Sequence, residues 1–160
     1  MEKQIFENAV ARNSRRLFLI ALSFTKNHDD SEDIVQNVFM KLWNGKNDFE
    51  NDEHINNWLT AVCVNESKNC LKYYFRKNTT DLDSACDLYS FDRQSDLDLF
   101  TAVMKLPKKD RVVIHLFYYE DLSIKQIADL LGVKETAVGT RLHRARSKLK
   151  EMLGDEWINE

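Results

Sequence analysis

The sequence is poor in the residues that interrupt helices. Its 160 residues include one proline and four glycines, so tight β-turns are scarce and long helices meet few breaks. Hydrophobic residues recur at helical spacing, and no sustained alternation of apolar and polar residues indicates a sheet. We therefore predict an all-α protein, with a core drawn from the 43% of residues that are hydrophobic.

Residues that build reactive sites are also few. The three cysteines, Cys63, Cys70 and Cys86, form no Cys-x-x-Cys pair, which argues against a disulfide framework or a zinc site and favours a reducing compartment. Four scattered histidines show no metal-ligand spacing. The sequence contains no glycine-rich phosphate loop and no nucleophile motif. We expect a protein that is not an enzyme and that has no metal, cofactor or small-molecule substrate.

Long hydrophobic runs are absent as well. The longest, residues 17–24, is interrupted by Ser23 and is too short to span a bilayer. The first ten residues, MEKQIFENAV, are charged from the second position and lack the apolar centre of a signal peptide. Together with the cysteine usage, these features lead us to expect a cytoplasmic protein.

Negative charge is concentrated in one segment. Residues 79–99, TTDLDSACDLYSFDRQSDLDL, contain six aspartates and one arginine, a net charge of −5, which leaves +2 for the rest of a chain whose total is −3. Weak periodicity and many Ser, Thr and Asp residues are typical of a flexible linker. We therefore predict two small helical domains, 1–78 and 100–160, joined by an acidic linker over 79–99. The linker is either a solvated tether or a negative strand that occupies a basic channel in a partner.

The N-terminal domain is expected to contain about four helices. The first or first two use the apolar positions between Phe6 and Phe24, and the next, HDDSEDIVQNVFMKLW, can be capped by Asp30 or Ser31. The apolar residues of this second stretch share one face, which we expect to be buried: Ile34, Val35, Val38, Phe39, Leu42 and Trp43. The opposite face is polar: Glu32, Asp33, Gln36, Asn37 and Lys41.

Another helix starts near His54 and ends in a mixture of aromatic and basic residues. The aromatic residues 73–75 stand among four cations: Lys68, Lys72, Arg76 and Lys77. Single-stranded nucleic acid is bound by such a combination, because the rings stack on bases and the cations attract phosphates. The same aromatic residues also fit a hydrophobic core, so two interpretations are open.

The C-terminal domain contains a helix-turn-helix pattern, DLSIKQIADLLGVKETAVGTRLHRAR. Ser123 and Gln126 form a capping-box pattern at the first helix, Gly132 supplies the turn, and the second helix begins at Glu135 or Thr136. The apolar residues of the second helix recur every three or four positions and are expected to be buried: Val138, Leu142, Ala145, Leu149 and Met152.

The outer face of that second helix is strongly basic. Residues 134–150 contain six basic residues and one acidic residue, a net charge of +5. A recognition helix places its N-terminal residues on base edges in the major groove, and further cations hold phosphates. Gly139 either permits close approach of DNA or is a tolerated surface glycine, and the whole pattern also fits an ordinary helical hairpin with a basic face. The candidate DNA-binding residues are Lys134, Glu135, Thr136, Thr140, Arg141, His143, Arg144, Arg146 and Lys148.

Three segments together resemble bacterial RNA polymerase sigma factors of the extracytoplasmic-function group (group 4). They are SEDIVQNVFMKLW, INNWLTAVCVNESKNCLKYYFRK and KLPKKDRVVIHLFYYEDLSIKQIADLLGVKETAVGTRLHRARSKLKE. Their order and spacing agree with that family over nearly the whole chain. The resemblance implies a protein that binds core RNA polymerase and directs promoter-specific initiation, with the C-terminal domain on the −35 element and in contact with the β flap.

The resemblance also implies roles for two sets of residues in the N-terminal domain. The interface with the clamp helices of the polymerase β′ subunit would comprise Asp33, Gln36, Asn37 and Lys41. The surface that opens the −10 element and holds an extruded base would comprise Asn65, Lys68, Asn69, Lys72, Tyr73 and Arg76, with the loop over 44–54. Trp58 is expected in the core.

Regulation and the main alternative complete the expectations. Members of this family are commonly inhibited by an anti-sigma factor, often membrane-anchored, and the resemblance implies such a partner. The alternative is a stand-alone helix-turn-helix regulator that binds duplex DNA as a dimer. The aromatic and basic residues near 73–77 argue against it, because duplex binding does not require them.

Overall fold

The structure, a computed structural model, describes the backbone of residues 1–77 and 94–154 and the side chains of residues 1–73 and 98–154. All regular structure in these ranges is helical, which confirms the all-α prediction. The chain divides into two compact units, Met1–Asp83 and Ser84–Glu160. None of the described helices combines the length and low polarity that crossing a membrane requires.

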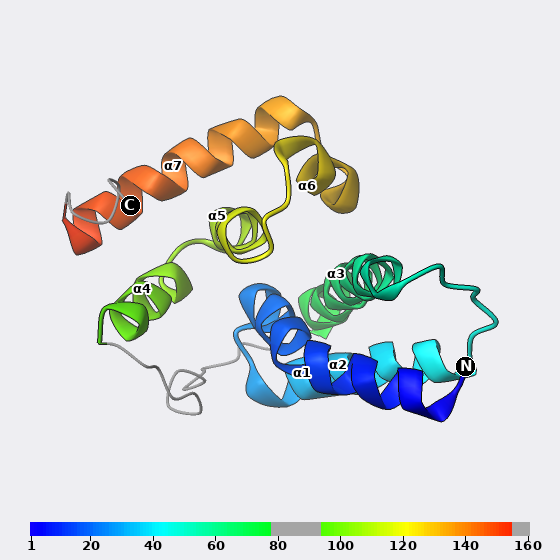
Figure 1. Cartoon of the computed structure of the whole chain (residues 1–160). Helices are drawn as coiled ribbons and strands as arrows, with labels where there is room; N and C mark the ends of the chain where they lie inside the picture. Colours follow the sequence, from blue (N-terminus) through cyan, green and yellow to red (C-terminus); the bar gives the residue numbers. More distant parts are fainter. Residues whose placement is uncertain (78–93, 155–160) are drawn as a thin grey trace. The chain divides into compact units, whose positions relative to one another are not determined.

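The N-terminal unit contains three helices within residues 1–77: α1 (Lys3–Thr25), α2 (His28–Asn44) and α3 (Asp52–Lys77). The prediction of about four was wrong because α1, which contains no glycine or proline, continues as one helix to Thr25. Lys26, at φ 50°, ends it in the left-handed region. Figure 1 shows α1, α2 and α3 lying against one another, and each pair of these helices is in contact.

The second helix starts and packs almost as its sequence indicates. Its N-cap is Asn27, whose side chain accepts a hydrogen bond from the Asp30 backbone nitrogen at 2.8 Å; the predicted caps, Asp30 and Ser31, lie inside the helix instead. Four residues of the apolar stripe are buried: Ile34, Val38, Phe39 and Leu42. Trp43 was expected in the core but is 47% exposed, because it lies in the last turn and only part of its ring covers Phe6, at a centroid distance of 4.9 Å.

A polar network fixes α3 against α1 beside the hydrophobic core. Asn13 is 2% exposed, and its Nδ2 donates to Ala9 O at 2.9 Å and to Asn56 Oδ1 at 3.0 Å. Arg16 Nη1 donates to Thr60 Oγ1 at 2.6 Å. Because buried polar groups are costly when unpaired, these bonds specify how α1 and α3 align.

The C-terminal unit contains α4 (Gln94–Met104), α5 (Lys108–Ile114), a π-helical turn η2 (His115–Tyr119), α6 (Ile124–Leu131) and α7 (Glu135–Leu153). The helix α4 begins inside the segment expected to be a linker, and the rest of that segment, 79–93, lies outside the described residues. The long helix α7 contacts α4, α5 and α6 (Figure 1).

The helix-turn-helix forms as predicted at its ends and along its buried stripe. Ser123 and Gln126 complete the capping box, with bonds of 3.1 Å and 2.9 Å. Gly132 adopts φ 68°, a left-handed conformation that suits glycine, and α7 begins at Glu135. Four stripe residues are buried: Val138, Leu142, Ala145 and Leu149. Met152 is 42% exposed instead of buried, because it lies in the last turn of α7.

Candidate nucleic-acid interface

The first turns of α7 present a polar surface, because the apolar stripe on the opposite face of the helix is buried. Thr136, Thr140 and His143 are exposed, and Arg141 is partly exposed. Thr140 Oγ1 donates to Thr136 O at 3.0 Å, so its hydroxyl oxygen still has lone pairs that can accept a hydrogen bond. Lys134 and Glu135, at the start of the helix, are exposed as well. These groups match the donor and acceptor types that read base edges.

Two of the predicted DNA-binding cations are held by a buried carboxylate of α5. The Asp110 side chain is 0% exposed. Arg144 Nε lies 3.0 Å from both of its oxygens, and Arg144 Nη2 donates to Oδ1 at 2.6 Å. Lys148 Nζ donates to Oδ2 at 3.2 Å. We call this cluster, Asp110 with Arg144 and Lys148, the Asp110 clamp; it joins α5 to α7.

The Asp110 clamp keeps the carboxylate ionised. Burial by itself raises the pKa of Asp110, but the hydrogen bonds and charges of Arg144 and Lys148 outweigh it, so the pKa lies below its usual value. The same carboxylate raises the pKa of Arg144. Both cations thus have a structural role that the sequence did not reveal, because Asp110 precedes α7 by more than twenty residues.

A third predicted cation, Arg146, also has an intramolecular partner. Its Nε donates to the Tyr118 hydroxyl at 2.7 Å, and its guanidinium carbon lies 5.5 Å from the ring centroids of both Phe117 and Tyr118. This places Arg146 on the π-helical turn, in a cation–π arrangement. The cations of α7 are therefore unequal. Arg144 and Lys148 are held by a carboxylate and Arg146 by a tyrosine, whereas Arg141 forms no ion pair or side-chain hydrogen bond with the described residues.

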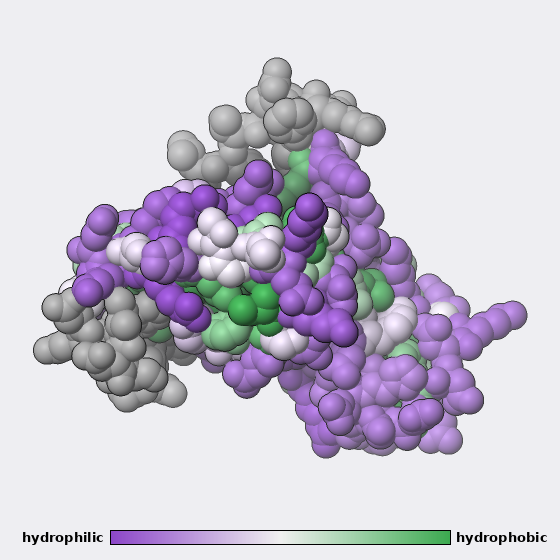
Figure 2. All heavy atoms as spheres, turned by 90° about the horizontal axis from the view of Figure 1, so that it is seen from above, coloured by the Kyte–Doolittle hydropathy of each residue, from purple (hydrophilic) through white to green (hydrophobic). Residues whose placement is uncertain are grey.

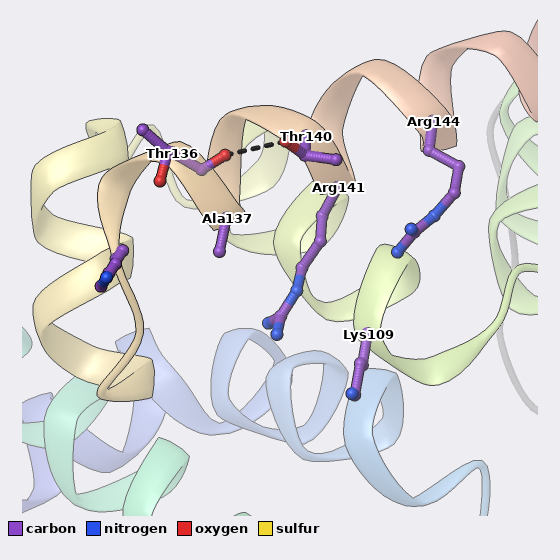
Figure 3. Close-up of a pocket in the computed structure, with 7 residues that line it drawn as sticks. Lys109, Thr136, Ala137, Thr140, Arg141 and Arg144 are labelled. Carbon is purple, nitrogen blue, oxygen red and sulfur yellow. Dashed lines mark hydrogen bonds between the residues drawn. The ribbon is translucent and has the colours of Figure 1, made fainter.

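An open cavity of about 420 Å³ lies where the first turns of α7 meet α5. In Figure 3, Arg141 and Arg144 extend from α7 towards the side on which Lys109 lies. The seven lining residues are Lys109, Lys134, Thr136, Ala137, Thr140, Arg141 and Arg144. Sequence analysis missed Lys109, because it lies on α5, outside the helix-turn-helix.

The candidate −10 residues lie along one side of α3 as far as the structure describes them. Asn65, Asn69, Lys72 and Tyr73 are exposed, and Lys68 is partly exposed. Tyr73 is 58% exposed, so this ring does not belong to the hydrophobic core of the unit. The Arg76 side chain lies outside the described residues.

The loop before α3 is anchored by an aromatic cluster. Phe49 contacts His54 and Trp58 edge-on, with centroid distances of 5.2 Å and 5.7 Å. Trp58, expected in the core, is only partly buried, because it covers this loop and not the centre of the bundle. The loop therefore has a fixed support next to the start of α3.

The four polar residues predicted on α2 are all exposed: Asp33, Gln36, Asn37 and Lys41. Lys41 forms an ion pair with Glu66 of α3. The structure adds Met40, which is 60% exposed beside them. Met40 lies seven residues after Asp33 and four after Gln36, and this spacing places the three residues on one face of α2. In the view of Figure 2, hydrophilic residues cover most of the visible described surface.

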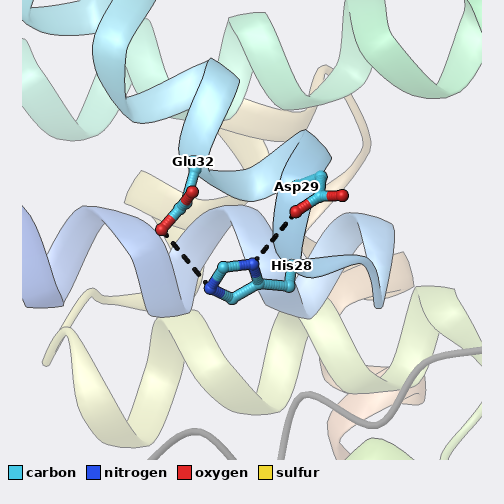
Figure 4. Close-up of side chains that lie close together, drawn as sticks. All are labelled: His28, Asp29 and Glu32. Carbon is cyan, nitrogen blue, oxygen red and sulfur yellow. Dashed lines mark hydrogen bonds and ion pairs between the residues drawn. The ribbon is translucent and has the colours of Figure 1, made fainter.

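One group of potential metal ligands occurs among the described residues. His28, Asp29 and Glu32 offer ligand atoms within 4.8 Å of one another. The two imidazole nitrogens bond different carboxylates, Nδ1 to Asp29 at 3.2 Å and Nε2 to Glu32 at 3.3 Å (Figure 4). Each imidazole nitrogen thus already has a carboxylate oxygen as its neighbour. The three side chains form a polar contact network in the first turns of α2.

Comparisons with known proteins identify the family. Residues 9–80 match the family described as Sigma-70 region 2, and residues 96–149 match Sigma-70, region 4. The sigma factor SigV of Bacillus subtilis is 28% identical over 157 residues, covering 96% of this chain and 94% of SigV. The ECF sigma factor SigM of Mycobacterium tuberculosis is 27% identical over 158 residues, covering 96% and 79%. The chain belongs to the ECF sigma factors of bacterial RNA polymerase.

Solved structures agree with this membership. CnrH in complex with the cytosolic domain of CnrY is 30% identical to this sigma factor, with a TM-score of 0.60 over 95% of this chain and 89% of CnrH. RpoE in complex with the anti-sigma factor NepR, from Bartonella quintana, has the same fold, with a TM-score of 0.74 at 24% identity over 96% and 99%. The function of this chain is therefore that of a polymerase sigma factor, and the alternative of a stand-alone regulator is not favoured. Sigma factors in general regulate transcription without being enzymes.

Proposed function

We propose that this sigma factor divides promoter recognition between its two helical units. Residues 1–78 bind core polymerase and open the −10 element, residues 100–160 read the −35 element, and residues 79–99 connect the two. The observation that carries the proposal is the surface of α7, where a buried stripe and the Asp110 clamp fix a helix whose first turns are polar and basic.

Recognition of the −35 element is assigned to the first turns of α7 in the major groove. Thr136, Thr140, Arg141 and His143 are the groups placed to meet base edges, with Arg141 able to bond guanine bidentately. Lys134 contacts a phosphate. Arg144, Arg146 and Lys148 contribute positive potential while they hold their intramolecular partners.

Opening of the −10 element is assigned to α3 and the loop that precedes it. Tyr73 offers an exposed ring for stacking, Asn65 and Asn69 offer amide groups for a base edge, and Lys72 attracts the backbone. Arg76 extends this cationic surface by its place in the sequence. Stacking and amide contacts offset the few kcal/mol that extrusion of a base costs.

The exposed face of α2 is assigned to the clamp helices of the β′ subunit. Asp33, Gln36, Asn37 and Lys41 supply the polar contacts, and Met40 supplies an apolar contact among them. Interfaces commonly place such a residue within a polar rim. The C-terminal unit contacts the β flap while α7 holds the −35 element.

Partners and location follow from the same assignment. This sigma factor acts on polymerase in the cytoplasm, performs no chemistry of its own and requires no cofactor. An anti-sigma factor is proposed as its inhibitor, because two of the similar solved structures each contain a sigma factor bound to a protein partner. Such a partner is often membrane-anchored in this family.

Run-off transcription with purified core polymerase and a promoter library tests the proposal. We expect initiation that requires this chain and that falls when the −35 element of a selected promoter is scrambled. The Arg141→Ala variant should lose transcription that depends on the −35 element, while its binding to core polymerase in a pull-down is unchanged. The Gln36→Ala variant should show the reverse pattern, with weaker core binding.

The stand-alone alternative predicts a different result. A regulator would bind its operator tightly without core polymerase and would never direct initiation. That outcome would overturn the assignment of function. Loss of core binding in the Arg141→Ala variant would instead show that the roles of the two units have been exchanged.

A further inference from the structure

We propose that the cavity between α5 and α7 binds one phosphate of the DNA backbone, and that Lys109 is a DNA contact outside the helix-turn-helix. This inference rests on the proposed role of α7 as the −35 reader and names the group that its flank would hold. The cavity of about 420 Å³ is lined by four cations and by no acidic residue. The four are Lys109, Lys134, Arg141 and Arg144.

Three of these cations are available for a ligand. Within the described residues, Lys109, Lys134 and Arg141 form no ion pair. Asp110, the acid next to Lys109 in the sequence, is buried and already bonded to Arg144 and Lys148. Apart from Arg144, the lining cations therefore carry positive charge that no ion pair among the described residues neutralises, and an anion is the group that the cavity suits.

Arg144 is held in a fixed position at the edge of the cavity. Its Nε and Nη2 are bonded to Asp110, and its Nη1 makes no hydrogen bond among the described residues. A guanidinium whose plane is fixed on one side by a carboxylate presents its remaining N–H groups in a set direction. Asp110 thus acts as a positioning residue for a donor that faces the cavity.

The N-terminus of α7 adds to the positive electrostatic potential of the cavity. The helix has 19 residues and no side-chain cap at Lys134, so the positive end of its dipole is not covered by a capping side chain. Glu135 lies in the same first turn but does not line the cavity.

Lys109 belongs to α5, so a phosphate that it binds together with α7 residues would also orient α7. A phosphate held between α5 and α7 is tied to two elements, so it sets the tilt of α7 in the groove as well as adding affinity. Phosphate contacts of this kind fix the register of a protein on DNA without reading sequence. We therefore expect the Lys109 contact to be equally strong on any promoter sequence, whereas Arg141 also discriminates among bases.

The test measures binding of the reconstituted holoenzyme to promoter DNA over a range of salt concentrations. For Lys109→Ala, the slope of log affinity against log salt should become shallower by about 0.9, the value for one phosphate contact. The ratio of wild-type affinity to Lys109→Ala affinity for promoter DNA should then decrease about threefold between roughly 0.05 and 0.2 M salt. Lys108→Ala is the matched control, because Lys108 is an exposed neighbour on α5 that does not line the cavity, and its slope should equal that of wild type.

A second measurement locates the phosphate. Single phosphates near the −35 element are replaced in turn by uncharged methylphosphonates. At the contacted position, the replacement should weaken wild type and Lys108→Ala more than it weakens Lys109→Ala, because Lys109 and that phosphate are partners of one interaction while the other lining cations remain. Additive effects at every position, or equal slopes for the Lys109 and Lys108 variants, would overturn the proposal.

Failure of the phosphate site is distinguishable from failure of the proposed function. If scrambling the −35 element weakens wild-type binding and Lys109→Ala behaves as Lys108→Ala does, the phosphate site alone is wrong. If scrambling the element has no effect on the wild-type holoenzyme, the assignment of α7 to that element is wrong.

Discussion

Replacement of Asp110 by asparagine removes the negative charge of the Asp110 clamp and keeps its shape. The wild-type carboxylate is fully buried and bonded to Arg144 at 2.6 and 3.0 Å and to Lys148 at 3.2 Å. The asparagine can still accept a hydrogen bond through its remaining oxygen, but its amide group faces cations that cannot accept one. The contact between α5 and α7 should therefore weaken without a change in core volume.

The expected loss is moderate. Hydrogen bonds to charged groups contribute about 1.5–3 kcal/mol, against about 0.5–1.5 kcal/mol for neutral ones, so the Asp110→Asn variant should be less stable by about 1–2 kcal/mol. Removal of a carboxylate that compensates fully buried charges would cost more, about 3–5 kcal/mol. The lower figure applies because the side chains of Arg144 and Lys148 are 48% and 38% exposed and can be solvated by water.

Hydrogen exchange read segment by segment is the appropriate measurement, because it separates the two units of the chain. Amides of α5 and α7 that exchange through opening of the C-terminal unit should exchange about tenfold faster in Asp110→Asn, since about 1.4 kcal/mol corresponds to a factor of ten. Amides of α1 to α3 should be unchanged. Asp129→Asn is the matched control, since Asp129 is exposed on α6.

The pH dependence provides a sharper test. Because the pKa of Asp110 is lowered on folding, its contribution is present near neutral pH and is lost as the pH falls below about 4. The difference between wild type and Asp110→Asn should therefore shrink as the pH is lowered further below this value. Equal exchange in Asp110→Asn and Asp129→Asn near neutral pH would refute the structural role of the clamp.

Further predictions concern a buried histidine, two glycines and an exposed methionine. Burial lowers the pKa of His115 from 6.5 to about 4, so as the pH falls the unfolded chain takes up a proton before the folded one does. The free energy of unfolding of the C-terminal unit should therefore decrease by roughly 3 kcal/mol between these two pH values. Chemical denaturation of His115→Leu should show a free energy of unfolding that depends less on pH in that range. Gly139→Ala should raise thermal stability by about 0.5–1 kcal/mol, because open space surrounds it in the helix, whereas Gly132→Ala should lower it by about 1 kcal/mol through its φ of 68°. Met40→Ala should weaken core polymerase binding in a titration by about 1 kcal/mol or more, while the free energy of unfolding changes by less than about 0.5 kcal/mol. The control is Met152→Ala, which also removes an exposed methionine and should bind core polymerase as wild type does.

Helix boundaries in this chain follow closely from local sequence. The capping box of Ser123 and Gln126, the turn at Gly132 and the start of α7 at Glu135 all appear where the pattern predicts them. Each depends on residues only a few positions apart, so the chemistry that specifies it is visible in a short window. Of the one or two helices that the stretch between Phe6 and Phe24 allowed, one forms, because no residue there interrupts it.

Burial at the ends of elements is less predictable than burial at their centres. Trp43 and Met152 continue apolar stripes, yet both lie in the last turn of a helix and are about half exposed. Helical periodicity gives the direction in which a side chain projects, but it carries no information on how far the neighbouring helices extend along it. Met40 shows the same limit, since its exposed position depends on which faces of α2 the helices α1 and α3 cover.

The sequence by itself determined the all-α class, the helix-turn-helix and the family, because periodicity, caps and motif order are local properties that survive without coordinates. It also showed that α7 is basic. Only the tertiary structure decided how those charges are used: Asp110 engages Arg144 and Lys148, Tyr118 engages Arg146, and Lys109 joins Arg141 at a shared cavity. These partners lie more than twenty residues from α7's cations along the chain, and electrostatic pairing depends on distance in space, which the packing of α5 against α7 sets.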